Sequence, residues 1–329
     1  MSRTVLVGFS ANMEMAVSGF DGTSDVVKQQ VAASDFDLIA AGSSFNVARA
    51  LLRSGQLVKL LCTVGDDRYA GYLEAELRRL ELDAFPLPLR ERTNITVSLS
   101  AKDGAQRIIA GKGNYLPDAM ERGAELIRRQ VDQVRPHMTV GTGVQIADAP
   151  LVLAMFEAGG RQAAPSMNIL NPGISLVYEL SNELEERRRH TALRQLLSCT
   201  DLLAVNEEEE AHLLRGFGFS TVSELQAIGQ GRHMEVLVTR GPKGATLYNG
   251  GEQSINGEVF ADTPIKDLTG AGDTFLSCYI GALLDGKSKS EALRWAAAGA
   301  AITISRLGGS SVPSRDEITQ FLAQRETVA

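Results

Sequence analysis

The chain has 329 residues, of which 44% are hydrophobic, 5% aromatic and 22% charged. This composition is that of a globular protein with a sizeable core, and it excludes a disordered chain, a collagen and a disulfide-bonded miniprotein. Lys and Arg number 33 against 40 Asp and Glu, which gives a formal net charge of -7. The chain therefore lacks the basic field with which proteins hold polyanions, and we do not expect nucleic acid as a main partner.

The three cysteines, Cys62, Cys199 and Cys278, lie far apart in apolar stretches. This pattern indicates reduced thiols rather than a disulfide framework. The first apolar run, residues 5–9, is interrupted by polar residues before a signal-peptide core is formed. No later run approaches the ~18 apolar residues of a membrane-spanning helix. We expect a cytoplasmic protein with no membrane partner.

Short runs of Val, Ile and Leu alternate along the chain with longer segments of helical period. We predict buried strands at residues 4–8, 58–64, 138–141, 167–170, 202–205 and 236–239. We predict helices at residues 46–54, 71–80, 276–284 and 286–304, the last of them apolar on every side. This alternation is typical of parallel strands joined by crossover helices. We predict an α/β fold, with a doubly wound, mostly parallel sheet flanked by helices.

Two segments depart from this rhythm. Residues 13–40 contain alternating polar and apolar positions, and residues 93–109 are typical of two strands around Asp103 and Gly104. Strands with this alternation have one face in water, so we expect them to form a small antiparallel sheet that acts as a lid. The lid would comprise about residues 10–40 and 93–112. Nothing divides the chain into independent domains, and we expect residues 1–329 to form a single α/β domain with the lid inserted in it.

Several common catalytic motifs are absent. The chain has no G-x-x-x-x-G-K-[ST] phosphate loop, no G-x-G-x-x-G after its first strand, no H-E-x-x-H and no G-x-S-x-G. Its four histidines have no ligand-like spacing with one another or with cysteine, so we do not expect a structural zinc site.

Residues 267–275, Asp-Leu-Thr-Gly-Ala-Gly-Asp-Thr-Phe, immediately precede a predicted helix. Small residues that open a helix leave several backbone N–H groups unpartnered beside the positive end of the helix dipole. We therefore predict an anion site at Gly270, Ala271 and Gly272, with Asp273 placed to accept a hydroxyl proton in phosphoryl transfer. Taken alone, the segment is also typical of a tight loop followed by an ordinary aspartate in the first helical turn.

Three further motifs precede this segment. They are Ala-Gly-Ser-Ser-Phe-Asn-Val-Ala at residues 41–48, Asn-Glu-Glu-Glu at residues 206–209 and Thr-Arg-Gly-Pro-Lys-Gly at residues 239–244. With these four motifs in this order, the sequence resembles the ribokinase family, also called the phosphofructokinase-B carbohydrate kinases, over nearly its whole length. Each motif also has an ordinary structural interpretation: a helix cap, a solvated acidic face, or turn glycines.

The resemblance implies a ribokinase-like fold and an ATP-dependent transfer of the γ-phosphoryl group to a hydroxyl of a sugar or sugar phosphate. It implies that Asp273 is the base and that the backbone of residues 270–272 holds the phosphoryl oxygens. Acceptor hydroxyls would be bound by Glu14, Gly42 and Asn46. The nucleotide would be bordered by Asn206, Thr239, Gly241 and Gly244.

The resemblance also implies two kinds of metal ion and a partner. Glu209 would help to hold Mg²⁺ through water, and Asp267 would belong to a loop that binds K⁺ in many relatives. Lid strands of relatives often pair between subunits, so we expect a homodimer. The chain departs from the family at Leu268, where Thr or Ser is usual, and at Ser44, where Gly or Ala is common. Glu14 stands at the end of the first strand, where many members carry Asp.

Two local features are similar to the phosphosugar branch typified by 1-phosphofructokinase and tagatose-6-phosphate kinase. They are Asn-Val-Ala-Arg-Ala-Leu at residues 46–51 and Arg-Thr-Asn-Ile-Thr-Val at residues 92–97. In such an enzyme Arg90, Arg92 and Lys112 would bind a substrate phosphate, although the three are equally typical of charges at the rim of a pocket. Three alternatives stay open: a nucleoside kinase of the same family, a non-catalytic nucleotide-binding or sugar-binding regulator, and a dehydrogenase, which would lack its usual glycine fingerprint.

Overall fold

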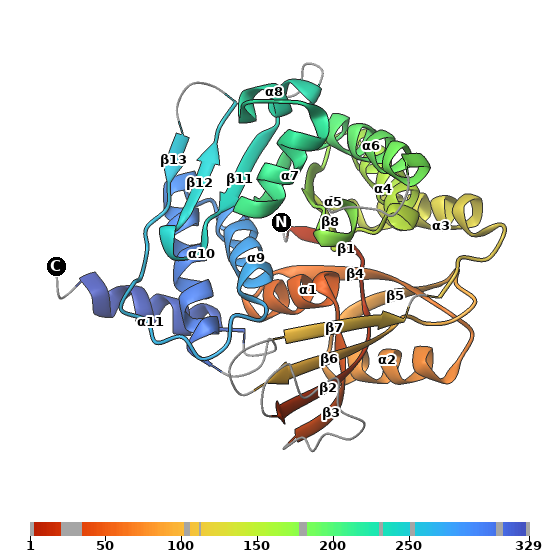
Figure 1. The fold of residues 1–329 in the computed structure, drawn as a ribbon, viewed down its shortest axis with the longest axis horizontal. Coiled ribbons are helices and arrows are strands. Elements are labelled where there is room, and N and C mark those ends of the chain that lie inside the picture. The colour runs from red at the N-terminus through yellow and green to blue at the C-terminus, as the bar shows by residue number, and fades with distance from the viewer. Residues whose placement is uncertain are drawn as a thin grey trace.

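A computed structural model of the chain describes residues 3–20, 35–101, 106–111, 113–177, 183–229, 233–250, 254–306 and 312–326. Figure 1 shows a large sheet covered by helices and, at one side of the molecule, a smaller sheet that lies apart from helices α3 (Ala119–Val134), α4 (Ala149–Gly160) and α6 (Glu183–Ser198). The predicted α/β class with a mostly parallel sheet is confirmed.

The large sheet has nine strands in the order β13-β12-β11-β10-β9-β8-β1-β4-β5. In chain order they are β1 (Thr4–Phe9), β4 (Leu57–Val64), β5 (Asp83–Pro88), β8 (Met138–Thr142), β9 (Met167–Asn171), β10 (Leu202–Asn206), β11 (Glu235–Thr239), β12 (Ala245–Tyr248) and β13 (Ser254–Asn256). The strands from β11 to β5 in this order pair in parallel, whereas β12 and β13 are antiparallel. All six predicted strands are present.

Alternate residues of the central strands enter two different cores. Val5 and Val7 of β1 pack on one face with helices α1 (Ser43–Arg53), α2 (Arg68–Arg79), α9 (Ala271–Leu284) and α10 (Lys289–Ile304). Leu6 packs on the other face with α3, α4, α6, α7 (Glu207–Phe217) and α8 (Val222–Gln226). Strands buried on both faces have few polar positions, which is why these runs are mostly apolar.

Two further helices are the short α5 (Ile174–Val177) and the C-terminal α11 (Arg315–Glu326). The predicted helix at residues 286–304 begins too early, because Gly286 adopts a φ of 83° and ends the turn after α9, and Ser288 caps α10. None of the helices in the described ranges combines the length and the apolar character needed to cross a bilayer.

The smaller sheet has four strands in the order β3-β2-β6-β7. They are β2 (Asn12–Phe20), β3 (Asp35–Ala41), β6 (Ile95–Ala101) and β7 (Gln106–Gly111). We expected an antiparallel sheet, but the central pair β2 and β6 is parallel. The two strands run the same way because β2 follows β1 and β6 follows β5, which belong to one parallel ladder. The predicted turn at Asp103 and Gly104 lies outside the described residues.

Candidate functional site

The site lies where the order of the large sheet changes direction. From β1 the chain moves to β4 and β5 on one side, whereas β8 to β11 lie on the other. In open α/β sheets, ligands bind outside the carboxyl ends of the strands at such a switch point. The residues that follow β1, β8, β9, β10 and β11 therefore form the candidate site.

Close contacts at two glycines bring these loops together. A Cβ atom built on Gly143, which follows β8, would lie 3.0 Å from the Cβ atoms of Ser10 and Ser43. One built on Gly173, which follows β9, would lie 3.1 Å from the Cα atom of Gly143. Ser10, Gly143 and Gly173 were not predicted as site residues. The sequence does contain a signal for two of them, since Gly143 and Gly173 each follow closely after a predicted buried strand.

Gly42 precedes α1 with a φ of 101°, a conformation that side-chain-bearing residues rarely adopt. A Cβ atom there would lie 2.4 Å from the carbonyl oxygen of Ser10. The peptide N–H of Ser44 donates to the same oxygen (3.0 Å), and the Oγ of Ser44 accepts from the N–H of Ser10 (2.8 Å). Gly42 therefore allows α1 to begin directly against the end of β1.

The predicted anion site is the N-terminus of α9. Gly270 caps the helix with a φ of 76°, and no side chain of the described residues accepts a hydrogen bond from its first turn. The N–H of Ala271 donates to the carbonyl of Leu268 (3.3 Å), so one of the predicted donors is already engaged. Gly272 is exposed, and a Cβ atom on it would meet no described atom within 4 Å. Among the described residues, the space beside Gly272 at the start of the helix is therefore open.

Asp273 lies in the first turn of α9, partly exposed. Its Oδ2 accepts a hydrogen bond from the Nδ2 of Asn46 on α1 (2.8 Å). Burial raises the pKa of Asp273 to about 6, against the effect of the Asn46 bond and with a further contribution from the charge of Glu209. The carboxyl group is thus a stronger base than an exposed aspartate, and still ionised at neutral pH.

Asn46 makes a contact that the sequence did not predict, and Glu14 lies on a different strand from the one expected. Asn46 was expected to bind acceptor hydroxyls, and the structure places its amide against Asp273. Glu14 was expected at the end of the first strand, but that strand ends at Phe9 and Glu14 lies within β2 of the small sheet. Its Oε1 accepts a hydrogen bond from Ser98 on the neighbouring strand β6 (2.6 Å). A lid strand therefore carries this carboxylate.

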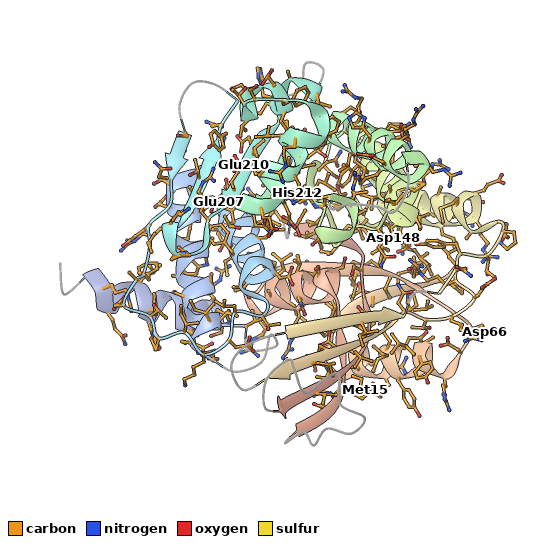
Figure 2. The ribbon with its side chains drawn as sticks, viewed as in Figure 1. Met15, Asp66, Asp148, Glu207, Glu210 and His212 are labelled. Atoms are coloured by element: carbon orange, nitrogen blue, oxygen red, sulfur yellow. The ribbon has the colours of Figure 1, made fainter. Side chains whose placement is uncertain are left out.

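The acidic run at the start of α7 divides into two groups. Glu209 is buried and forms a capping box: its Oε2 accepts from the N–H of Asn206 (3.0 Å), and Asn206 Oδ1 accepts from the N–H of Glu209 (2.8 Å). Burial raises the pKa of Glu209. Glu207 and Glu210, both labelled in Figure 2, instead pair with cations of the loop after β11.

That loop contains Thr239, the last residue of β11, and then a tight turn from Gly241 to Gly244. Gly241 and Gly244 have φ values of 54° and 86°. Within the loop, Arg240 lies 3.0 Å from Glu210 and Lys243 lies 3.1 Å from Glu207. The four charged groups hold the loop beside the N-terminus of α7.

Asp267 is partly exposed, and its Oδ1 accepts from the N–H of Thr269 (2.9 Å) in the turn that leads to Gly270. Its own N–H donates to Ile304 at the end of α10 (3.2 Å). Among the described residues, no group of three or more His, Cys, Asp or Glu side chains is arranged to hold a metal ion.

The three residues predicted to bind a substrate phosphate are Arg90, Arg92 and Lys112. Arg92 is exposed, and Lys112 lies outside the described residues. Arg90 is buried and pairs with Asp148, so the prediction that it binds a substrate phosphate is wrong. An arginine in an apolar interior needs a carboxylate partner, and Asp148 meets that need.

Comparisons with known proteins agree with this geometry. Residues 11–316 match the profile of the pfkB family carbohydrate kinases. The chain is 26% identical over 329 residues to ribokinase from Haemophilus influenzae, covering 97% of each chain. It is 25% identical over 287 residues to ATP-dependent ribose-1-phosphate kinase from Halopiger xanaduensis, covering 86% of each.

Among solved structures, ribokinase from Thermotoga maritima superposes with a TM-score of 0.73 at 23% identity, covering 98% of this chain and 99% of that one. This likeness shows a shared fold. Because the family profile spans nearly the whole sequence, the chain belongs to the pfkB family of carbohydrate kinases and is an ATP-dependent phosphotransferase that acts on a hydroxyl group.

Proposed function

We propose that the protein transfers the γ-phosphoryl group of ATP to a hydroxyl of a sugar or sugar phosphate, with Asp273 as the base. One observation carries this assignment: a carboxyl group with a pKa of about 6 lies in the first turn of a helix whose N-terminus no described side chain caps. A base and an anion site are thereby adjacent, as phosphoryl transfer requires.

In this reaction the acceptor hydroxyl attacks the γ-phosphorus, the bond to ADP breaks, and Asp273 takes the hydroxyl proton. Asn46 holds the Asp273 carboxylate in place through its amide. The backbone at Gly270, Ala271 and Gly272 provides positive potential for the phosphoryl oxygens, chiefly through the N–H groups that follow the Ala271 donor. Gly42 and Glu14 would contact the acceptor, and closure of the small sheet would exclude water.

The nucleotide would lie along Asn206, Thr239, Gly241 and Gly244, which the capping box and the turn after β11 hold in place. Two carboxylates, Glu209 and Asp273, lie close enough for the charge of one to raise the pKa of the other. A dication fits such a pair, so Glu209 would help to hold Mg²⁺, which neutralises phosphate charge. K⁺ would bind at the turn that contains Asp267, where the carboxylate and neighbouring carbonyls would supply oxygen ligands.

The acceptor class follows from the rim of the site. Arg92 is exposed beside the small sheet, which supports an acceptor that carries a phosphate, and the relative from Halopiger xanaduensis is named for ribose 1-phosphate. The relative from Haemophilus influenzae is a ribokinase, which supports a free sugar. We place ribose and small sugar phosphates first.

The test is an acceptor screen with ATP and Mg²⁺ that measures ADP release. The panel contains ribose, ribose 1-phosphate, fructose phosphates, adenosine and inosine, with Asp273→Asn as the inactive control. Turnover with a sugar or sugar phosphate is expected. Turnover with nucleosides alone would make the protein a nucleoside kinase, and ATP binding without turnover across the panel would make it a regulator.

The outer face of the small sheet supports a homodimer. One apolar row crosses this face, because apolar residues on neighbouring strands are paired directly. The row consists of Leu38 on β3, Met15 on β2, Val97 on β6 and Ile109 on β7. Leu38 is 43% exposed and Ile109 is 59% exposed. We propose that the row packs against a second copy and that residues 1–329 act as one catalytic unit. The three free cysteines support a reducing compartment such as the cytoplasm.

A further inference from the structure

A buried ion pair lies where the small sheet joins the body of the protein. The Nη2 of Arg90 is 2.6 Å from the Oδ1 of Asp148, and each residue is only 3% exposed. Arg90 lies between β5 and β6, and Asp148, labelled in Figure 2, lies at the start of α4. The phosphoryl-transfer roles described above use neither residue.

The pair is completed by hydrogen bonds. Arg90 donates to the Oγ1 of Thr63 (2.7 Å), the carbonyl of Gly113 (2.7 Å) and the hydroxyl of Tyr115 (2.9 Å). Its guanidinium also lies 3.9 Å from the centre of the Tyr115 ring. The Tyr115 hydroxyl donates to the Oδ1 of Asp148 (2.5 Å). Burial and the Asp148 carboxylate raise the pKa of Tyr115, so it stays a donor.

Further contacts join the two segments that flank the hairpin of β6 and β7: residues 89–91, which lead into it, and residues 114–116, which follow it. Arg90 and Tyr115 form a β-bridge, the N–H of Glu91 donates to Asn114 (2.9 Å), and the N–H of Leu116 donates to Leu89 (2.9 Å). The outgoing and returning segments are thus tied to each other and, through Arg90, to Asp148.

Asp148 continues the connection toward the acceptor side of the site. Its Oδ2 accepts from the N–H of Gln145 (3.3 Å), in the loop that leaves β8. The same loop contains Gly143, which lies against Ser10 and Ser43. One carboxylate therefore holds the loop after β8 and the entrance to the small sheet together.

Arg92 lies two residues beyond Arg90, and two glycines, Gly65 and Gly113, pack closely against its backbone. A Cβ atom on Gly65 would lie 2.6 Å from the Cα of Arg92, and one on Gly113 would lie 1.9 Å from its carbonyl oxygen. The N–H of the next residue, Thr93, donates to Asp67 Oδ2 (2.8 Å). The backbone of Arg92 is fixed, while its side chain is exposed.

We propose that Arg90, Asp148 and Tyr115 are positioning residues for acceptor binding, which hold Arg92 and the small sheet in the correct place relative to the loop after β8. This inference rests on the proposed function, because it takes the acceptor to bind between these segments. The three residues act through their neighbours and do not touch the reacting atoms.

Tyr115→Phe tests the inference with the smallest change, since it removes one hydroxyl and keeps the ring beneath Arg90. Losing the two hydrogen bonds of this hydroxyl, from Arg90 and to Asp148, should raise KM for the acceptor about fivefold and leave KM for ATP and kcat within about twofold. The matched control is Ser166→Ala, which removes a buried hydroxyl bonded to the carbonyl of Pro136 (2.6 Å). Ser166 precedes β9 at the amino end of that strand, whereas the candidate site lies at the carboxyl ends. The control should lower Tm without changing either KM.

A second measurement does not need activity. Hydrogen exchange of the segment 89–95 should be faster in Tyr115→Phe than in the wild type, and unchanged in Ser166→Ala. If Tyr115→Phe lowers Tm alone, as Ser166→Ala does, with both KM values and the exchange unchanged, the network is purely structural and the inference is wrong. A wild-type protein that turns over no acceptor would instead contradict the proposed function, while faster exchange in the variant would still support the role of the network in fixing this segment.

Discussion

At the scale of single residues, Asp273 is placed at a cost to stability. Its pKa is about 6 in the folded protein against 3.8 for an ordinary aspartate, chiefly because of burial. Between these values the folded state binds the proton more tightly than the unfolded state. Stability from this group is therefore fully present below about pH 4 and is lost as the pH rises through 6. At neutral pH the ionised carboxylate destabilises the protein.

Asp273→Asn should separate the loss of stability caused by the ionised carboxylate from its role as the base. Asparagine still accepts the Asn46 hydrogen bond but cannot take a proton, so turnover should fall by about 10²- to 10⁴-fold. At pH 7.5 the variant should be more stable than the wild type by about 1–2 kcal/mol, because the side chain is partly exposed and solvent reduces the full effect. Denaturant unfolding at pH 7.5 and pH 4 checks this, since the difference should vanish at the lower pH. Equal stability at both would show that the carboxylate is not desolvated.

Glu209→Gln should change the pH dependence of the reaction. In the wild type, kcat/KM should fall about tenfold per pH unit below pH 6, as Asp273 takes up its proton. Glutamine retains an oxygen to accept the Asn206 N–H but loses the charge that raises the pKa of Asp273. The acidic limb of the profile should therefore move to lower pH. If the acidic limb of the kcat/KM profile were unchanged in the variant, the carboxylates of Glu209 and Asp273 would not interact.

Gly272→Ala tests how closely the phosphoryl group approaches α9. The position is helical and open, so the fold should tolerate a methyl group, and alanine favours helix over glycine by about 1 kcal/mol. A bound phosphoryl group would meet that methyl, so kcat/KM should fall by at least about tenfold with Tm unchanged or raised. Gly71→Ala, at another open helical glycine, should leave activity intact. Normal activity in both variants would place the phosphoryl group elsewhere.

At the scale of elements, the sequence predicted what periodicity and motifs encode. The six buried strands are mostly apolar, and they were found. Strand β5 was missed because its two prolines are unfavourable in a strand, and the structure tolerates them at the edge of the sheet. The motifs located Gly42, Asn206 and Asp273. The contact between Asn46 and Asp273 joins residues 227 positions apart, and no local pattern records it.

The connection from β3 to α1 depends on Gly42. Gly42→Ala would place a methyl group in a strained conformation and 2.4 Å from the Ser10 oxygen. Strain alone costs about 1–2 kcal/mol, and the clash should add to it. Gly55→Ala, also at positive φ but with open space around it, shows the strain without the clash. Urea unfolding should find Gly42→Ala the less stable variant, and equal losses would mean that the close approach to Ser10 is unimportant.

At the scale of the whole molecule, a net charge of -7 does not oppose the binding of ATP and a phosphorylated acceptor. Positive potential is needed only locally, and the start of α9 and the exposed Arg92 lie where anions are expected. Much of the acidic charge near the nucleotide side is already paired, as Arg240 with Glu210 and Lys243 with Glu207 show.

The apolar row on the small sheet predicts that the protein is a homodimer. If the row packs against a second copy, light scattering should give twice the chain mass for the wild type, and Ile109→Lys should give a monomer, because a lysine would bury its charge at the interface. Leu57→Lys is the matched control: Leu57 is as exposed as an interface aliphatic but lies at the start of β4 in the large sheet, and this variant should stay dimeric. Since Glu14 and Ser98 lie on the same small sheet, the monomer should also bind the acceptor more weakly while its KM for ATP is unchanged. A monomeric wild type would leave the row to some other partner.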